Sequence, residues 1–272
     1  TNHLQAAGFS VVDIPMLSLE ARPTTEQDMA LMRQWFAGDY QALVIVSPTA
    51  AASGLAVWQA LEHERQAQLA EVNNSAQKDV SFKGLTAPSH LIAVGEATAA
   101  VLNDAKLDAT NYQVLQPLIA NNEGMLAMPE IDSLQAGDKL LAWRGLGGRR
   151  LLVNTLQARG VHIDSIAWYE RKMPNDAMAQ YKEWYAQYLN QKSEQHRPIV
   201  IVSSGTAFEH WQAIVTEVAA QKANAEKSNR APLQLNDFAY VVLGERLANM
   251  VAGQDLSYWR VEDLAPETIV AA

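Results

Sequence analysis

The sequence contains no cysteine among its 272 residues. This absence excludes a disulfide scaffold, a zinc site built from thiolates and a cysteine nucleophile. The six histidines are scattered, and His63-Glu64 lacks the second histidine of a zinc-protease helix, so no metal is expected. A chain without cysteine is compatible with a reducing compartment, and a cytoplasmic location is expected.

Long apolar runs, an export signal and an excess of positive charge are also missing. No apolar run approaches the roughly 20 residues of a membrane-spanning helix. The net charge is −9, whereas a protein dedicated to nucleic acid needs a basic face. Neither a membrane nor a nucleic acid is therefore expected as a partner, and nothing in the sequence demands more than a monomer.

Familiar catalytic motifs are absent as well. The chain has no P-loop and no G-x-S-x-G turn of a serine hydrolase. The turn Arg144–Arg149 (RGLGGR) resembles a nucleotide loop, but Arg150 stands where the dinucleotide fingerprint has its last glycine. An enzyme acting on nucleotides or sugar phosphates is therefore supported by this turn alone.

What is present is an ordinary globular composition, 49% apolar and 19% charged, with a βαβ pattern in Lys139–Lys172. The pattern predicts a buried strand over Leu140–Trp143, a glycine-rich turn, a helix over Leu151–Leu156 that Gly160 ends, and an extended segment over Val161–Tyr169. The apolar residues of this segment should alternate, with Val161 and Ile163 on one face and Ile166 and Trp168 on the other.

Parts of this pattern recur. The matched segments, about 150 residues apart, are LQAAG (4–8) with LQARG (156–160), VIVS (44–47) with VIVS (200–203), and LIAVG (91–95) with YVVLG (240–244). The order is the same in both copies, which indicates two copies of one α/β unit. The repeat also predicts that a strand and a Gly/Arg turn precede Thr1, so the chain is expected to begin within a unit.

Strands and helices alternate along the rest of the chain. Strands are expected near 42–47, 91–94, 112–116, 198–203, 238–243 and 256–261. Helices are expected after the capping signal Thr25-x-x-Asp28 and near 49–61, 95–102, 121–124, 176–189, 208–220 and 244–251. Phe9–Leu19 reads as an extended edge or linker strand because Pro15 interrupts it. This alternation predicts parallel sheets with helices on both faces.

Ligands of parallel sheets bind beyond the carboxyl ends of the strands, where turns and helix starts present backbone N–H groups. The turns at these positions are rich in Ser, Thr, Gly and Arg, a composition that binds carboxylates or phosphates. The candidate binding residues are Ser47, Thr49, Gly95, Thr98, Arg144, Gly145, Arg149, Ser203, Ser204, Gly205, Gly244 and Arg246. Taken singly, each of them also fits an ordinary role as a helix cap or turn residue.

Together, these motifs resemble the uroporphyrinogen-III synthase family over most of the chain. The motifs are VIVSPTAA (44–51), VGEATA (94–99), the Arg144–Leu156 turn and helix, YER (169–171), SSG (203–205) and the Gly244–Ala248 helix start. The resemblance implies two doubly wound α/β domains of similar topology, joined by two extended linker strands near 9–19 and 161–169. The first domain is then discontinuous, 1–17 with 170–272, and the second is 18–169. A cleft between the domains is implied too.

The resemblance also implies a reaction that needs no metal or organic cofactor. Hydroxymethylbilane, a linear tetrapyrrole, loses its terminal hydroxyl as water, and ring D inverts through a spiro intermediate to give uroporphyrinogen III. Tyr169 matches the family tyrosine proposed to assist the leaving hydroxyl as an acid. The binding turns listed above would then hold the acetate and propionate groups of the pyrroles.

The chain departs from the family pattern in two places. The early Thr-Arg-Pro type of strand is absent, and Leu247 stands in a helix start where many members have a threonine, so Arg246 is expected to hold a carboxylate instead. An alternative from another class is a hinged, two-domain binding protein that clamps a small anionic ligand without chemistry.

Overall fold

The computed structural model describes residues 2–72, 85, 87–105, 113–148, 150–190, 196–224 and 231–272. The chain divides into two compact units. Unit 1 consists of Thr1–Ser18 and Arg171–Ala272, and unit 2 of Leu19–Glu170. The chain therefore passes from one unit to the other twice, and each unit is built around a sheet of its own.

The sheet of unit 2 has six strands in the order β1-β6-β5-β2-β3-β4. The strands are β1 (Ser18–Ala21), β2 (Ala42–Ile45), β3 (His90–Ala93), β4 (Val114–Leu115), β5 (Lys139–Gly145) and β6 (His162–Lys172). Parallel pairing joins β6 to β5, β5 to β2, β2 to β3 and β3 to β4. The prediction of a mixed α/β fold with parallel sheets is therefore confirmed.

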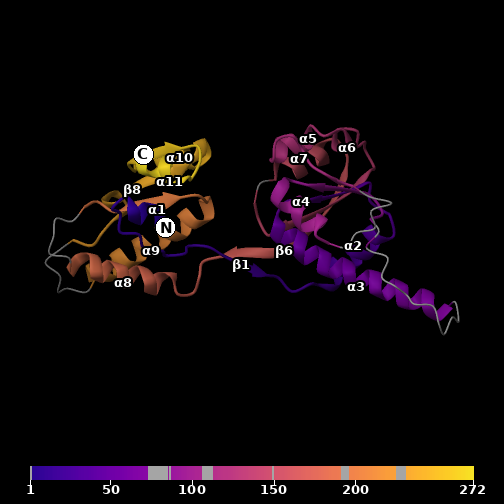
Figure 1. Cartoon of the computed structure of the whole chain (residues 1–272), viewed down its shortest axis with the longest axis horizontal. Coiled ribbons are helices and arrows are strands. Elements are labelled where there is room, and N and C mark those ends of the chain that lie inside the picture. Colours follow the sequence, from indigo (N-terminus) through magenta and orange to yellow (C-terminus); the bar gives the residue numbers. More distant parts are fainter. Residues whose placement is uncertain are drawn as a thin grey trace. The chain divides into compact units, whose positions relative to one another are not determined.

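Helices cover both faces of this sheet (Figure 1). One face packs against α2 (Glu26–Phe36), α3 (Pro48–Val72) and α4 (Glu96–Asn103). The other face packs against α5 (Asn122–Leu126), α6 (Pro129–Asp132) and α7 (Leu151–Ala158). The first core holds four tryptophans in edge-to-face contact, namely Trp35, Trp58, Trp143 and Trp168, with ring centroids 4.8–6.0 Å apart.

Side-chain alternation along β6 follows the sequence prediction. Val161 and Ile163 pack into the core beneath α5–α7, whereas Ile166 and Trp168 pack into the core beneath α2–α4. The capping signal before α2 is confirmed too, because Thr25 accepts a hydrogen bond from the Asp28 N–H while the Asp28 carboxylate accepts one from the Thr25 N–H. Local patterns in the sequence thus determine the faces and starts of these elements.

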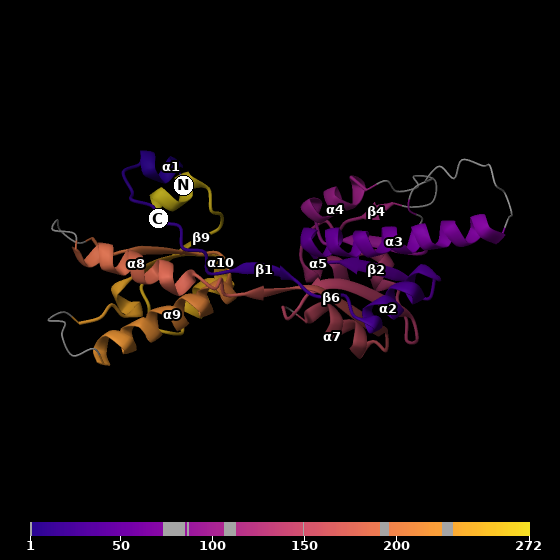
Figure 2. The same ribbon diagram turned by 90° about the horizontal axis from the view of Figure 1, so that it is seen from below.

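Unit 1 has a smaller parallel sheet in the order β7-β8-β9, made of β7 (Ile199–Val202), β8 (Ala239–Leu243) and β9 (Tyr258–Val261). Its core lies against α8 (Ala177–Asn190), α9 (Gly205–Asn224) and α10 (Gly244–Ala252), and Figure 2 shows α8 beside α9. The short elements are α1 (Asn2–Ala6), η1 (Leu235–Asp237) and α11 (Pro266–Ala271). On the opposite face, Ile199 and Ile201 are 51% and 41% exposed, so helices cover that face less completely than either face of unit 2.

The three repeated sequence motifs have matching local structures. VIVS contains the last residues of β2 and of β7 and the residues that follow, and each strand pairs in parallel with the strand of the next motif, β3 or β8. LQAAG and LQARG each end a helix, and their glycines Gly8 and Gly160 both have a positive φ, +93° and +86°. Because a positive φ strains any residue with a Cβ atom, the two glycines act as equivalent helix terminators.

The expected linker strands differ from the observed ones. Residues 9–17 form no strand, and β1 begins only at Ser18, after Pro15, which has no N–H for a ladder. Residues 162–169 pair with β5 and belong to the sheet of unit 2, so this stretch is not a free linker. The Ser18 hydroxyl donates a hydrogen bond to the Lys172 carbonyl, and the Arg22 N–H donates one to the Trp168 carbonyl. β1 and β6 are therefore antiparallel.

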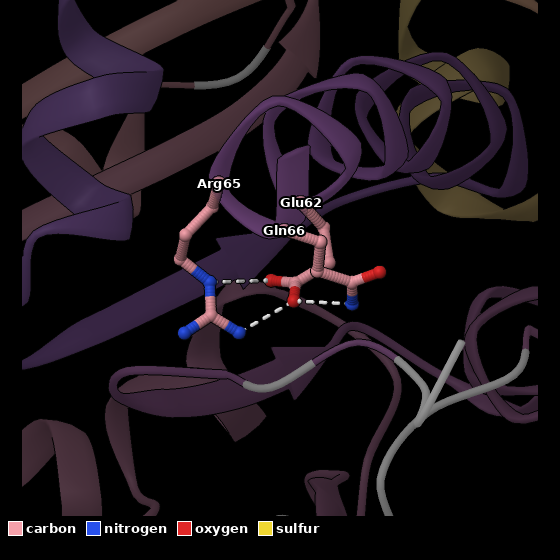
Figure 3. A network of polar contacts seen from close by, with 3 residues as sticks. All are labelled: Glu62, Arg65 and Gln66. Carbon is pink, nitrogen blue, oxygen red and sulfur yellow. Dashed lines mark hydrogen bonds and ion pairs between the residues drawn. The ribbon is translucent and has the colours of Figure 1, made fainter. Parts of the chain in front are cut away.

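Donors from the same helix satisfy a buried carboxylate in α3. Glu62 has no exposed surface, and its oxygens accept hydrogen bonds from the Arg65 guanidinium at 2.5 and 3.3 Å and from the Gln66 amide at 2.9 Å (Figure 3). A buried carboxylate costs free energy unless such donors satisfy it. Arg65 also lies over the Phe36 ring of α2, 5.7 Å from its centroid, and therefore ties the two helices together.

Replacing Arg65 with alanine is expected to lower the free energy of unfolding by about 1–2 kcal/mol, because a buried carboxylate would lose its charged donor. The matched control is Arg33→Ala, which removes an ion pair with Glu64 at 3.9 Å whose side chains are 61% and 56% exposed. Such a pair contributes under about 0.5 kcal/mol. Urea denaturation of both variants gives the comparison, and equal losses would contradict a special role for Glu62.

Within the part of the chain that the structure describes, no helix combines the length and the apolar character needed to cross a membrane. The same residues contain no cluster of three or more His, Asp or Glu side chains able to hold a metal ion.

Candidate functional site

The candidate residues of unit 2 lie where neighbouring parallel strands end. Ser47 follows β2, Gly95 follows β3, Arg144 and Gly145 end β5, and Tyr169 pairs with Gly145 from β6. Because these strands are parallel and adjacent, their carboxyl ends lie along the same edge of the sheet. The structure therefore brings together residues that are up to 122 positions apart in the sequence.

This edge contains a topological switch point between β2 and β5. The helix after β2, α3, packs on one face of the sheet, whereas the helix after β5, α7, packs on the other. Where two adjacent strands send their helices to opposite faces, the turns diverge and leave a crevice that binds ligands in open α/β sheets. Ser47 begins one of these diverging connections, and Arg144 and Gly145 begin the other.

Tyr169 reaches across this switch point. Its hydroxyl donates a hydrogen bond to the Ser47 hydroxyl, with 3.1 Å between the oxygens. The ring passes Gly145 so closely that a Cβ atom there would lie 2.6 Å from Cζ and 2.7 Å from Cε2. Real Cβ atoms do not approach that closely, so only glycine at position 145 lets the tyrosine of β6 reach the end of β2.

Ser47 is also the cap of α3. Its hydroxyl oxygen accepts a hydrogen bond from the Ala50 N–H at 3.1 Å, and its carbonyl accepts one from the Ala51 N–H. Thr49 follows in the first turn of α3 and is half-buried. Two candidate hydroxyls thus sit at the start of this helix, where backbone N–H groups and the helix dipole favour negative charge.

Arg144 folds back over its own turn. Its guanidinium donates to the Gly145 carbonyl at 3.2 Å and to the Gly147 carbonyl. Burial, followed by the neighbouring Arg150, lowers the pKa of Arg144, whereas nearby Tyr169 raises it. Arg144 therefore supplies a positive charge beside the Tyr169 hydroxyl. Arg149, the other candidate arginine of this turn, lies outside the described residues.

The turn after β3 is less open than the sequence suggests. Gly95 caps α4 without a side-chain hydrogen bond, and a Cβ atom at Gly95 would lie 2.9 Å from Ala120. Thr98 is only 2% exposed, so its side chain is directed into the core and not toward solvent. The sequence pattern identified a helix start here, but it could not show which side of the helix Thr98 occupies.

The candidates of unit 1 form a second group at the carboxyl ends of β7 and β8. Ser204 caps α9 through a bond from the Ala207 N–H at 3.4 Å, and exposed Ser203 precedes it. A Cβ atom at Gly205 would lie 3.2 Å from Nη1 of Arg246, which places that guanidinium at the start of α9. Gly244 has φ +71° and begins α10, so the turn before Arg246 requires glycine.

The loop before α5, residues 118–120, was not among the candidates predicted from the sequence. Leu118 and Ile119 are 106% and 64% exposed, beside Ala120, which contacts the Gly95 turn. The bond from Asn121 N–H to the Ile119 carbonyl holds the loop at 2.8 Å. The sequence does contain a sign of this loop, because Leu118 and Ile119 lie between Pro117 and the helix cap Asn121. Neither strand nor helix periodicity explains two adjacent aliphatic residues at this point.

Comparison with known proteins supports one family. Residues 1–262 match the family model described as uroporphyrinogen-III synthase HemD. The uroporphyrinogen-III synthase of Salmonella typhimurium is 35% identical over 80 residues, 29% of this chain and 30% of that protein. The Escherichia coli protein of the same name is 27% identical over 127 residues, 46% of each chain. The chain thus spans less than half the length of the curated relatives it matches.

A solved structure shares the fold. A mutant uroporphyrinogen III synthase from Thermus thermophilus superimposes with a TM-score of 0.54 at 11% sequence identity. The match covers 99% of this chain and 90% of that one. At this identity the likeness concerns the fold alone.

Proposed function

The chain belongs to the uroporphyrinogen-III synthase family, and we propose that it converts hydroxymethylbilane to uroporphyrinogen III. In this reaction the linear tetrapyrrole loses its terminal hydroxyl as water and closes into a ring with ring D inverted. The enzyme is a cyclising hydro-lyase that uses no cofactor, acts as a monomer and works in the cytoplasm. The proposed enzyme has a discontinuous first domain, 1–17 with 170–272, and a second domain, 18–169, a division that the two compact units of the chain support.

The observation that carries the proposal is the hydrogen bond between Tyr169 and Ser47 at the switch point of unit 2. A hydroxyl leaves carbon readily only if it receives a proton, and a positioned side chain can supply one. A tyrosine and a serine in contact, with the charge of Arg144 beside them, form a group able to donate that proton. Tyr169 and Ser47 meet at the carboxyl edge of the sheet, at the switch point between β2 and β5, where parallel sheets bind their ligands.

The remaining candidates suit the charge of the substrate. Each pyrrole carries an acetate and a propionate, so the substrate is a polyanion. The described turns offer hydroxyls, backbone N–H groups at helix starts, and a few guanidiniums, all of which donate hydrogen bonds to carboxylates. Donors held by helix caps and strand ends need no reorganisation when the anion binds, which suits a site of modest positive charge in a chain of net charge −9.

Arg246 provides a test of carboxylate binding by unit 1. We expect Arg246→Ala to raise KM about five- to tenfold while kcat changes less than about twofold, because the lost interaction is the same in ground and transition states. The matched control is Lys222→Ala, which removes a cation near the far end of α9, about 25 Å along the helix from Gly205. An unchanged KM for Arg246→Ala would remove this residue from the site.

The proposed function is tested by turnover. With protein far below the substrate concentration, an enzyme consumes all the hydroxymethylbilane faster than the spontaneous closure, whereas a binding protein protects at most one equivalent. Acceleration by catalytic amounts of protein is the expected result. Protection of a stoichiometric amount without acceleration would support the hinged binding protein instead.

A further inference from the structure

Tyr169 and Ser47 differ in how far a ligand can reach them. Tyr169 is 2% exposed, enclosed by the core beneath α2–α4 and by Gly145. Ser47 is partly exposed at the start of α3. Of the two residues, Ser47 therefore offers more surface to a substrate that enters along the carboxyl edge of the sheet.

The hydrogen bonds at Ser47 have a direction. The Ser47 oxygen accepts from the Ala50 N–H and from the Tyr169 O–H, both at 3.1 Å. A serine hydroxyl has two acceptor lone pairs and one donor hydrogen. With both lone pairs engaged, the hydrogen of Ser47 points away from these two partners, and within the described part of the chain it is left for a ligand.

We propose that Ser47, and not Tyr169, donates the proton to the leaving hydroxyl of the substrate, and that Tyr169 then transfers its own proton to Ser47. This inference rests on the proposed function. It makes Ser47 the catalytic residue that touches the substrate and gives Tyr169 the role of the proton source.

The proton transfers balance without any further reactant. The C–O bond of the hydroxymethyl group breaks with its electron pair on oxygen, which takes the Ser47 proton and leaves as water. Ser47 takes the Tyr169 proton, so serine is restored and tyrosinate remains. The nitrogen lone pair of the pyrrole stabilises the carbon left behind. Ring closure later expels one proton from a pyrrole carbon, and this proton returns the tyrosinate to phenol.

Arg144 lowers the free energy of the tyrosinate intermediate. Its guanidinium lies close enough to Tyr169 for the two to attract each other when the phenol loses its proton. The Ala50 N–H acts at the other end, because its bond to Ser47 fixes the oxygen in line with the tyrosine hydroxyl. The start of α3 therefore positions Ser47, and the guanidinium of Arg144 stabilises the charge on Tyr169, so the two residues can act as a proton relay.

The test compares Ser47→Ala, Tyr169→Phe and the double variant in the hydroxymethylbilane assay. We expect each single change to lower kcat about ten- to hundredfold, and the double variant to be no slower than the slower single, because the two groups act as one. Ser47→Thr, which keeps a hydroxyl, should recover much of the rate. In mixtures of H₂O and D₂O the wild-type rate should curve with deuterium content, as two moving protons require, and Ser47→Ala should lose that curvature.

Two controls separate chemistry from folding. Ser47→Gly removes the hydroxyl but costs only a few tenths of a kcal/mol as a helix cap, so it should fold and still be slow. Thr25→Ala removes the equivalent cap of α2, outside the site, and should keep wild-type kcat. If Ser47→Gly turns over normally while Tyr169→Phe is slow, the proton comes directly from Tyr169 and the relay is wrong. If wild type itself shows no turnover, the proposed function fails and the relay fails with it.

Discussion

Gly145→Ala is expected to lower turnover about a hundredfold, because the added methyl group would displace Tyr169. The added Cβ would lie 2.6–3.0 Å from Cζ, Cε2 and the hydroxyl of Tyr169, so the ring must move. Movement of about 1 Å in a catalytic group is enough to cost two orders of magnitude in rate. The hydrogen bond to Ser47 would be lost at the same time.

The matched control is Gly54→Ala in α3. There a Cβ would lie 2.3 Å from Cε3 of Trp143, a clash of the same kind with a ring that belongs to the core. Overpacking of this sort costs about 1–3 kcal/mol of stability. Rates are compared at a temperature where near-ultraviolet circular dichroism shows both variants folded. Gly54→Ala should keep most of its turnover per folded molecule, and equal losses in the two variants would mean that Gly145 matters only for stability.

Tyr169→Phe is expected to lower kcat about ten- to hundredfold, because the acid group formed with Ser47 would lose its proton source. The ring stays, so the packing beside Gly145 is kept, and the stability should fall by no more than about 1 kcal/mol for the lost hydrogen bond. Steady-state kinetics and urea denaturation of the same preparation measure both effects. A normal kcat would contradict the role of Tyr169 as the proton source.

Tyr181→Phe is the control for removing a phenolic oxygen. The Tyr181 hydroxyl is buried, and among the described residues it has no hydrogen-bond partner. Burial raises the pKa of this phenol, with Tyr185 the next cause, so it is neutral at physiological pH. Removing an unsatisfied buried hydroxyl should leave stability unchanged or slightly higher. Turnover should be unaffected, because Tyr181 lies in the core of unit 1.

The sequence predicted the elements of the fold well where local patterns decide. The alternation of Val161, Ile163, Ile166 and Trp168 and the capping box at Thr25 depend on near neighbours, and the structure confirms both. Phe9–Leu19 was expected to be a strand, yet residues 9–17 form none. A segment becomes a strand only by pairing with another strand, and the local sequence does not show which distant segment that partner is.

The site was predictable in part for the same reason. Turn composition located the carboxyl ends of β2, β3, β5, β7 and β8, because Ser, Gly or Arg stands at or just after the end of each of these strands. It could not show that Tyr169 crosses Gly145 to reach Ser47, because that contact joins three strands and depends on their order in the sheet. It could not show either that Thr98 faces the core, since a helix start does not determine which residue of the first turns points outward.

The most direct test of the account is the identity of the ring that the protein makes. Hydroxymethylbilane is generated in the presence of the protein, the products are oxidised, and the uroporphyrin isomers I and III are separated. Isomer III is expected to predominate, because without an enzyme to guide ring D the bilane closes without inversion and gives isomer I. Isomer I alone, from folded protein, would contradict it and leave the fold without the proposed reaction.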